Sequence, residues 1–245
     1  MLAGYWALLT FVPVREIHLE KDHLRQLAAQ TGITNAATLF FGTTNRVTGA
    51  FDMGMNLPNH FDFQYLPGKK WDTYWDPEGL LSTLPAIASC LLGVFAGCLL
   101  RSSVSDQRKV MYLLVGGVLS LIAGFLWGLQ FPIIKKIWTS SYVLVAGGYS
   151  AILLGVFYQM VDIWKWQQWC QTFVWIGMNS ITIYMANNLI GFRRLAARFV
   201  GGDVKEFLDR HITSGFGDLT LSLAGLALAV WFVYFLYRKK IFLRL

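Results

Sequence analysis

Residues 110–134 read VMYLLVGGVLSLIAGFLWGLQFPII, a run without a single Asp, Glu, Lys or Arg. A helix needs about 20 mostly apolar residues to cross the hydrocarbon core of a bilayer, and this run is long enough. Within hydrocarbon each backbone N–H and C=O must be bonded inside its own segment, which favours a helix over any other structure. The stretch therefore predicts a transmembrane helix.

Four other runs have the same property. They cover residues 79–100, 137–161, 166–192 and 219–237. Of the 245 residues, 55% are hydrophobic and 14% charged, whereas soluble domains average about 25% charged. A soluble protein with five such core helices in one small domain is the alternative, and the length of the runs disfavours it. The sequence thus predicts an all-α fold, a polytopic membrane helix bundle with five full transmembrane helices in residues 79–245.

The part of the chain before residue 79 differs from these runs. Residues 1–14 are apolar but cover only about two-thirds of a span, which predicts a truncated N-terminal transmembrane helix. Residues 15–78 are polar and predict an outer, periplasmic loop region. Leu19, Leu24 and Leu27 recur at roughly helical spacing, so a surface helix is expected over 18–30. The Gly and Pro residues of the remainder predict loop.

Basic residues indicate which side of the membrane each loop occupies, because cytoplasmic loops carry an excess of Lys and Arg. The two sides are nearly balanced in this chain, and the terminal cluster decides between them. That cluster comprises Arg238, Lys239, Lys240 and Arg244. We therefore expect a cytoplasmic C-terminus and an outer 15–78 region. The net charge of +7 fits contact with anionic membrane lipid, and no nucleic-acid motif accompanies it.

The sequence contains no pattern typical of a metal, phosphate or disulfide site. None of the three cysteines lies in the predicted outer loop, so no disulfide framework is expected. The four histidines all lie in predicted loops, and no proton relay across the membrane is expected from them. Metal-ligand spacing, a Gly-rich phosphate loop and a catalytic triad are missing from the sequence, so no metal is predicted.

The motif WDPEGLLST at residues 75–83 stands where the outer region enters the bilayer. Asp76 followed by Pro77 is a typical helix start, with the Asp as cap. The functional alternative is an acceptor mouth. There the carboxylates of Asp76 and Glu78 would accept hydrogen bonds from sugar hydroxyl or ammonium groups, and Trp75 would offer an apolar face.

Two further polar groups occur near or within the predicted spans. Residues 131–142, FPIIKKIWTSSY, place Trp138 and a hydroxyl cluster including Ser141 at an outer turn. These hydroxyls either cap the next helix or line a polar cavity, and Trp138 fits an interfacial aromatic belt. Residues 177–188, GMNSITIYMANN, place Asn179 and Ser180 deep within a span, where polar groups serve as helix–helix contacts or line a channel.

Taken in order, five segments resemble the heparan-α-glucosaminide N-acetyltransferase family of transmembrane acyltransferases, including its bacterial members. The segments are LLTFVPV at 8–14, WDPEGLLST at 75–83, FPI with KKIWTSSYV at 131–143, GMNSI at 177–181 and LYRKKIF at 236–242. The resemblance covers most of the chain and corresponds to the C-terminal part of such a protein. It implies a bacterial inner-membrane location, and a homodimer by analogy alone.

The resemblance implies that acetyl-CoA binds at the cytoplasmic side and that its acetyl group passes to a glucosamine-type amine or glycan on the other side. The amine must be neutral to attack the thioester, so a general base is required. In the family this base is a histidine upstream of the segments found here. We therefore predict no catalytic residue in this chain and no activity of the chain alone.

The resemblance and the motifs together define the predicted binding residues. The predicted acceptor-binding set is Asp76, Glu78, Trp138, Ser141, Asn179 and Ser180. The predicted partners of the CoA phosphates are Arg101, Arg108 and Lys109, for which a simple positive-inside role is the alternative.

Two other functions remain open from the sequence. The second hypothesis is a component of a transporter or flippase that moves a sugar or lipid-linked sugar without chemistry. A purely structural subunit is a third reading, which the polar residues within the spans disfavour.

Overall fold

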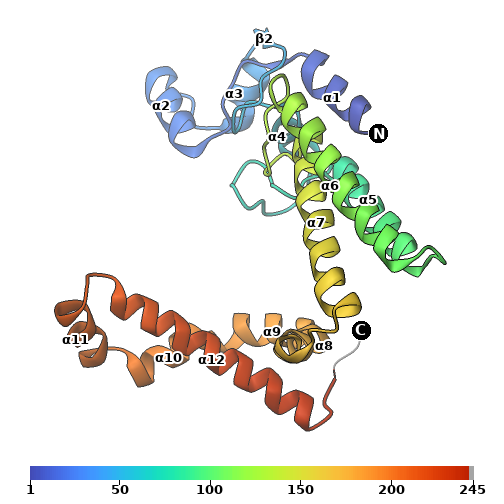
Figure 1. The fold of residues 1–245 in the computed structure, drawn as a ribbon. Helices are drawn as coiled ribbons and strands as arrows, with labels where there is room; N and C mark the ends of the chain where they lie inside the picture. Colours follow the sequence, from blue (N-terminus) through green and yellow to red (C-terminus); the bar gives the residue numbers. More distant parts are fainter. Residues whose placement is uncertain (243–245) are drawn as a thin grey trace. The chain divides into compact units, whose positions relative to one another are not determined.

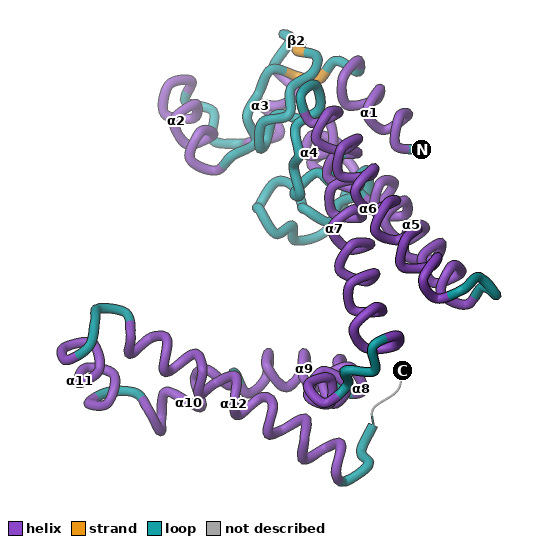
Figure 2. Tube along the Cα trace, in the orientation of Figure 1, coloured by secondary structure: helices purple, strands orange, loops and turns teal. Residues whose placement is uncertain are grey.

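The computed structural model describes residues 1–242 and divides the chain into two compact units, Met1–Ile163 and Trp164–Leu245. Arg244, part of the C-terminal basic cluster, lies outside the described residues. Nearly all regular structure is helical, as Figures 1 and 2 show, so the all-α prediction is confirmed.

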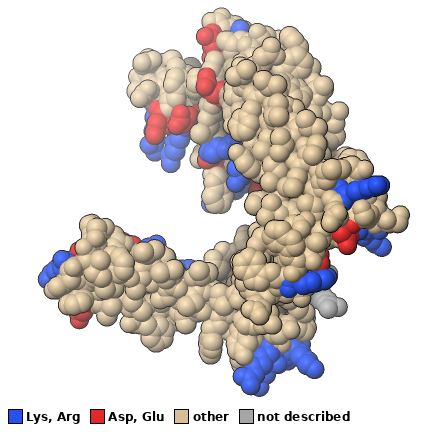
Figure 3. Space-filling view, viewed as in Figure 1, with Lys and Arg blue, Asp and Glu red and all other residues tan. Residues whose placement is uncertain are grey.

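The first unit contains three long apolar helices that match predicted spans. They are α5 (Thr83–Arg101), α6 (Asp106–Gly128) and α7 (Ser140–Tyr158), and α7 continues through a π-helical turn, η1 (Gln159–Ile163). The α6 helix ends at Gly128, before the end of the predicted run, because Pro132 has no N–H to continue the ladder. Figure 3 shows charged side chains at the turn between α5 and α6, with uncharged surface along the helices.

Helices α6 and α7 pack closely because glycines lie at their contact (Figure 2). A Cβ on Gly148 would lie 2.7 Å from the carbonyl oxygen of Gly117, so the two backbones approach where neither has a side chain. The Ser120 hydroxyl also donates to the Leu144 carbonyl at 2.7 Å across the pair.

The N-terminal region is more structured than the sequence predicts. It comprises α1 (Leu2–Phe11), β1 (Val14–Arg15), α2 (Lys21–Thr31), α3 (Ala36–Gly42), β2 (Arg46–Val47) and α4 (Leu57–Tyr65). The predicted surface helix is confirmed as α2. The prediction of loop for the remainder is wrong for α3 and α4. Side chains of Asn35 and Asn56 cap these two helices by accepting backbone N–H groups, which stabilises short helices within a polar region.

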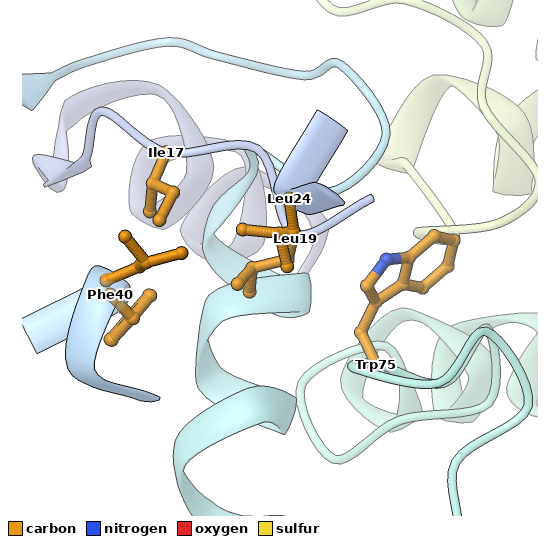
Figure 4. Packing of buried hydrophobic residues seen from close by; sticks show 6 residues of the cluster. Ile17, Leu19, Leu24, Phe40 and Trp75 are labelled. Carbon is orange, nitrogen blue, oxygen red and sulfur yellow. The ribbon is translucent and has the colours of Figure 1, made fainter. Parts of the chain in front are cut away.

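Two apolar clusters hold this region together. The first comprises Ile17, Leu19, Leu24, Leu39, Phe40 and Trp75, and Figure 4 shows five of these residues labelled. The second comprises Tyr5, Leu9, Phe131 and Ile137 and joins α1 to the turn between α6 and α7. Trp75, directly before the Asp76–Pro77 motif, is therefore part of a packed core.

The second unit contains one long apolar helix, α12 (Phe216–Arg238), which matches the last predicted span. Before it come η2 (Gln168–Cys170), α8 (Gln171–Met178), α9 (Ser180–Ile190), α10 (Phe192–Val200) and α11 (Asp203–His211). Among residues 1–242, four helices are long and apolar enough to cross a membrane. The fifth predicted run, 166–192, is divided at Asn179, which has φ −127° and ψ 29°, and it ends at Gly191 in the left-handed region. The break follows from the backbone conformation at Asn179 and not from a charged residue, so a criterion of length and apolarity alone missed it.

Candidate functional site

The polar residues of α4 form a buried cluster beside the predicted acceptor mouth. Asn56 and Asn59 are each 1% exposed. The Asn56 amide donates to the Asn59 side-chain oxygen at 2.8 Å, and that oxygen also accepts from the Gly54 N–H at 2.9 Å. These bonds fix the start of α4 and thereby the positions of the two ionisable residues that follow.

His60 is held by the backbone of two loop segments. Its Nε2 lies 3.0 Å from the Ile17 carbonyl oxygen and 3.2 Å from that of Gly54. Both neighbours are acceptors, so Nε2 carries the proton. Burial lowers the pKa of His60, and the nearby positive charges of His18 and Arg15 act in the same direction. The folded environment therefore favours the neutral form of the imidazole more than water does.

Asp62 lies against the Pro77–Leu80 segment of the WDPEGLLST motif. Its Oδ1 accepts from the Leu80 N–H at 3.0 Å, and a Cβ built on Gly79 would collide with the carboxylate. Glycine is required at position 79 by this close approach. Burial raises the pKa of Asp62, and the Leu80 N–H opposes the rise only in part. Asp62 is the main site residue that the sequence analysis missed.

Asp76 orders the motif itself. Its two carboxylate oxygens accept from the N–H groups of Trp71 and Glu78, each at 3.0 Å. The predicted capping of a helix by Asp76 is wrong, because α5 begins only at Thr83 with Ser82 in the cap position. Glu78 is exposed. The motif thus presents one carboxylate bound by backbone and one on the surface.

Lys136 connects the turn between α6 and α7 to the loop before the motif. Its Nζ lies 3.3 Å from the Asp72 carboxylate and 5.2 Å from the centre of the Trp75 ring. The turn between α6 and α7 and the motif are therefore held side by side in the first unit.

Trp138 lies in the same turn between α6 and α7, and Ser141 lies in the first turn of α7. The Trp138 indole N–H donates to the Ser89 hydroxyl on α5 at 3.0 Å. The Ser141 hydroxyl donates to the Phe131 carbonyl at 2.7 Å, and Thr139 caps α7 by accepting from the Tyr142 N–H. Of the two alternatives for this hydroxyl cluster, the structure places the buried hydroxyls at the helix start, bonded to protein.

Asn179 and Ser180 lie in the second unit, at the junction of α8 and α9. Asn179 is 1% exposed, and neither its amide nitrogen nor its amide oxygen has a partner among residues 1–242. The Thr182 hydroxyl is likewise buried and unpartnered within the described chain, whereas Ser180 is exposed. Buried polar atoms without partners are uncommon and costly, which makes Asn179 a candidate ligand-binding group.

The predicted CoA-phosphate residues gather around the turn between α5 and α6. Arg101 and Arg108 are exposed, whereas Lys109 is buried. The Lys109 ammonium lies 3.1 Å from an Asp106 carboxylate oxygen, which also accepts from the Tyr158 hydroxyl at 2.8 Å. Only the two arginines present their charge freely to solvent. Within residues 1–242 no group of three or more His, Cys, Asp or Glu forms a candidate metal site.

The long apolar helices define an integral membrane protein. A structured polar region lies at one end of its first unit. The chain is 30% identical over 176 residues to human heparan-alpha-glucosaminide N-acetyltransferase and 28% identical over 182 residues to the mouse protein. Each match covers 69% of this chain and 25% of the relative, so the chain spans about a quarter of the length of these relatives. No family model matches the chain. The resemblance to this acetyltransferase family, inferred from five sequence segments, is confirmed.

Proposed function

We propose that the chain forms the acceptor-side portion of a bacterial inner-membrane acetyltransferase. In this proposal an acetyl group passes from acetyl-CoA at the cytoplasmic face to the amine of a glucosamine-type sugar or glycan on the outer side. The homology to two acetyltransferases over 69% of the chain carries the reaction class. The C-terminus is cytoplasmic, and a homodimer is expected by family analogy alone.

The reaction requires that the amine arrive and lose its proton. The neutral nitrogen attacks the thioester carbonyl, the C–S bond breaks, and CoA leaves as a thiolate that takes up a proton. A base supplied from outside this chain accepts the proton of the amine, and holding both substrates in one pocket supplies the proximity effect. The part of this chain is to recognise the sugar and position its amine.

The two carboxylates of the motif differ in their contacts and exposure, which supports different proposed roles. Asp76 is engaged by two backbone N–H groups and orders the turn, whereas Glu78 is exposed. We assign Glu78 to the sugar ammonium, which a surface carboxylate attracts through a charge-assisted hydrogen bond. Trp138 and Ser141 of the first unit remain proposed acceptor-binding residues, as do Asn179 and Ser180 of the second unit, each taken by itself. Arg101 and Arg108 are proposed to attract the CoA phosphates.

Labelled acetyl transfer from acetyl-CoA to glucosamine tests the proposal in membranes. We expect no transfer with the chain alone and transfer when it is expressed with the coding sequence immediately upstream. In that active form Glu78→Gln should raise KM for glucosamine roughly tenfold with a smaller change in kcat. Glu16→Gln, a change at another exposed Glu, is the matched control. Equal KM values for the two variants would refute the role of Glu78.

A sugar transporter is the second candidate, because of the helix break at Asn179. Transporters bind substrate at interrupted helices whose polar groups lack internal partners, and the Asn179 amide fits this description. Uptake of labelled glucosamine into vesicles without acetylation of the sugar would favour transport. Acetylated sugar as the labelled product would favour the enzyme.

A further inference from the structure

Two arginines oppose each other across the short ladder of β1 and β2. The antiparallel register pairs Arg15 with Arg46 and Val14 with Val47. Directly opposed residues have their side chains on the same face, where like charges repel. Neither arginine forms an ion pair with an acidic side chain among residues 1–242. The ladder therefore carries two positive charges without a counter-ion in the described chain.

Arg15 is fixed in place before any ligand binds. Its Nη1 donates to the carbonyl oxygens of Thr43 at 2.7 Å and Phe41 at 3.2 Å. The guanidinium carbon lies 5.3 Å from the ring centre of Phe40 and 5.5 Å from that of Phe41. These contacts use only part of the five N–H donors of a guanidinium. A pre-positioned arginine loses little conformational entropy on binding an anion.

A cavity of about 110 Å³ lies at this ladder, with Arg15, Arg46, His60 and Gln64 in its lining. Phe40, Phe61 and Leu57 form apolar parts of the wall. The cavity is small beside the roughly 300–1,000 Å³ of pockets for drug-sized ligands, so it suits one small charged group. The apolar wall strengthens the attraction between the arginines and such a group by excluding water.

His60 adds a buried polar group to the same lining. It is 4% exposed, and its Nε2–H is engaged by two backbone carbonyls, which leaves Nδ1 without a partner among residues 1–242. The charges that act on the ring, Arg15 and His18, are both basic. Among the described residues, none of those that line the cavity is acidic.

We propose that this cavity is a binding site for a single oxyanion group, a phosphate, sulfate or carboxylate, held by Arg15 and Arg46. The group has two chemically equivalent sources, a small anion or anionic sugar in solution and the headgroup of an anionic phospholipid. The site is separate from the proposed acceptor residues and does not depend on acetyl transfer.

The test uses the full chain in nanodiscs. Inorganic phosphate is titrated against the chain in phosphatidylcholine nanodiscs, and the midpoint of thermal unfolding is followed. The same midpoint is then measured in phosphatidylglycerol nanodiscs without phosphate. Arg46→Gln is the main variant, because Arg46 is exposed and its side chain forms no hydrogen bond or ion pair with the rest of residues 1–242. Arg25→Gln, at another exposed arginine, is the control with the same change in charge.

We expect phosphate, phosphatidylglycerol or both to raise the midpoint of the wild type and of Arg25→Gln. The apparent affinity should fall roughly tenfold in Arg46→Gln, as expected for loss of a charge-assisted hydrogen bond. A response to phosphate in phosphatidylcholine identifies a soluble anion as ligand, and a response to phosphatidylglycerol alone identifies a headgroup. The proposal is overturned if the wild type responds to neither, or if Arg46→Gln responds as strongly as Arg25→Gln.

Discussion

The asparagines of α4 and the asparagine between α8 and α9 are equally buried but differ in bonding. Asn56, Asn59 and Asn179 are each 1% exposed. The first two share hydrogen bonds with each other and with the backbone, whereas the side chain of Asn179 has no partner among residues 1–242. A bonded buried amide stabilises the fold around it, and an unbonded one costs free energy. The hydrogen bonds of Asn56 and Asn59 thus stabilise the start of α4, although the Asn59 amide nitrogen has no partner among residues 1–242. Asn179 has no side-chain hydrogen bond within those residues, so its whole amide is available to a ligand.

The largest effect on the free energy of unfolding is expected from a substitution of Gly79, beside α4. In Gly79→Val the new side chain would occupy the space of the Asp62 carboxylate and separate it from the Leu80 N–H. We expect a loss of about 3 kcal/mol or more in the free energy of unfolding, from overpacking and a displaced buried carboxyl. Gly93→Val is the control within a helix, because no described atom lies within 4 Å of that position. Equal midpoints of thermal unfolding for the two variants would contradict the position of the Asp62 carboxylate against Gly79.

A substitution of Asn179, between α8 and α9, is expected to raise the free energy of unfolding instead of lowering it. Asn179→Leu replaces an unpartnered buried amide with an apolar group of similar size, so thermal stability should rise by about 1–3 kcal/mol. The active form carrying this change should lose acetyl transfer or sugar uptake. The matched change Asn59→Leu should instead destabilise, since it breaks bonds to Asn56 and Gly54. A destabilised Asn179→Leu would show that the amide is bonded in the native protein.

A smaller effect is expected at the start of α7. Thr139→Val removes the hydroxyl that accepts from the Tyr142 and Ile134 N–H groups. Loss of such a cap costs about 1 kcal/mol, which a shift of the unfolding midpoint would detect. Thr83→Val provides the comparison, since that hydroxyl only donates to the Gly79 carbonyl and caps no N–H group. A larger shift in Thr83→Val would contradict the capping role of Thr139.

The smallest effect concerns pH. Burial lowers the pKa of His60 below its ordinary value of 6.5, so between these two values the unfolded chain binds a proton that the folded chain does not. Stability is therefore complete above pH 6.5 and falls as the pH drops toward the folded pKa. His60→Gln, which keeps a donor for the two carbonyls, should reduce this acid sensitivity. His23→Gln, at an exposed position, should leave it unchanged.

Asp62 gives the opposite pH dependence, because its contribution to stability is lost as the pH rises. Its pKa is raised above the ordinary 3.8, so its contribution is complete below that value and is lost as the pH rises through the folded pKa. Asp62→Asn keeps an acceptor for the Leu80 N–H and should remove this second dependence. Unfolding midpoints between pH 4 and pH 8 would separate the two residues.

The long apolar helices were predictable because hydropathy and length alone decide whether a segment suits a bilayer. The division of residues 166–192 into α8 and α9 was not predictable, because it depends on the local backbone conformation at Asn179. Asp62 and His60 were missed because their environment comes from residues distant in sequence, Leu80 for one and Ile17 for the other. The sequence signal for α4 was present in Asn56 and Pro58, a cap followed by a proline in the first turn.

The contact of Gly117 with Gly148 has a consequence for biogenesis. Helices α6 and α7 are antiparallel and joined by one turn. Their backbones touch, and the Ser120 hydroxyl donates to the Leu144 carbonyl, so the pair forms stabilising contacts without any other helix. Such a hairpin is able to leave the translocon as one unit. The residues of its turn, including Lys136 and Ile137, would then be in place to contact Asp72 and Tyr5 of the N-terminal region.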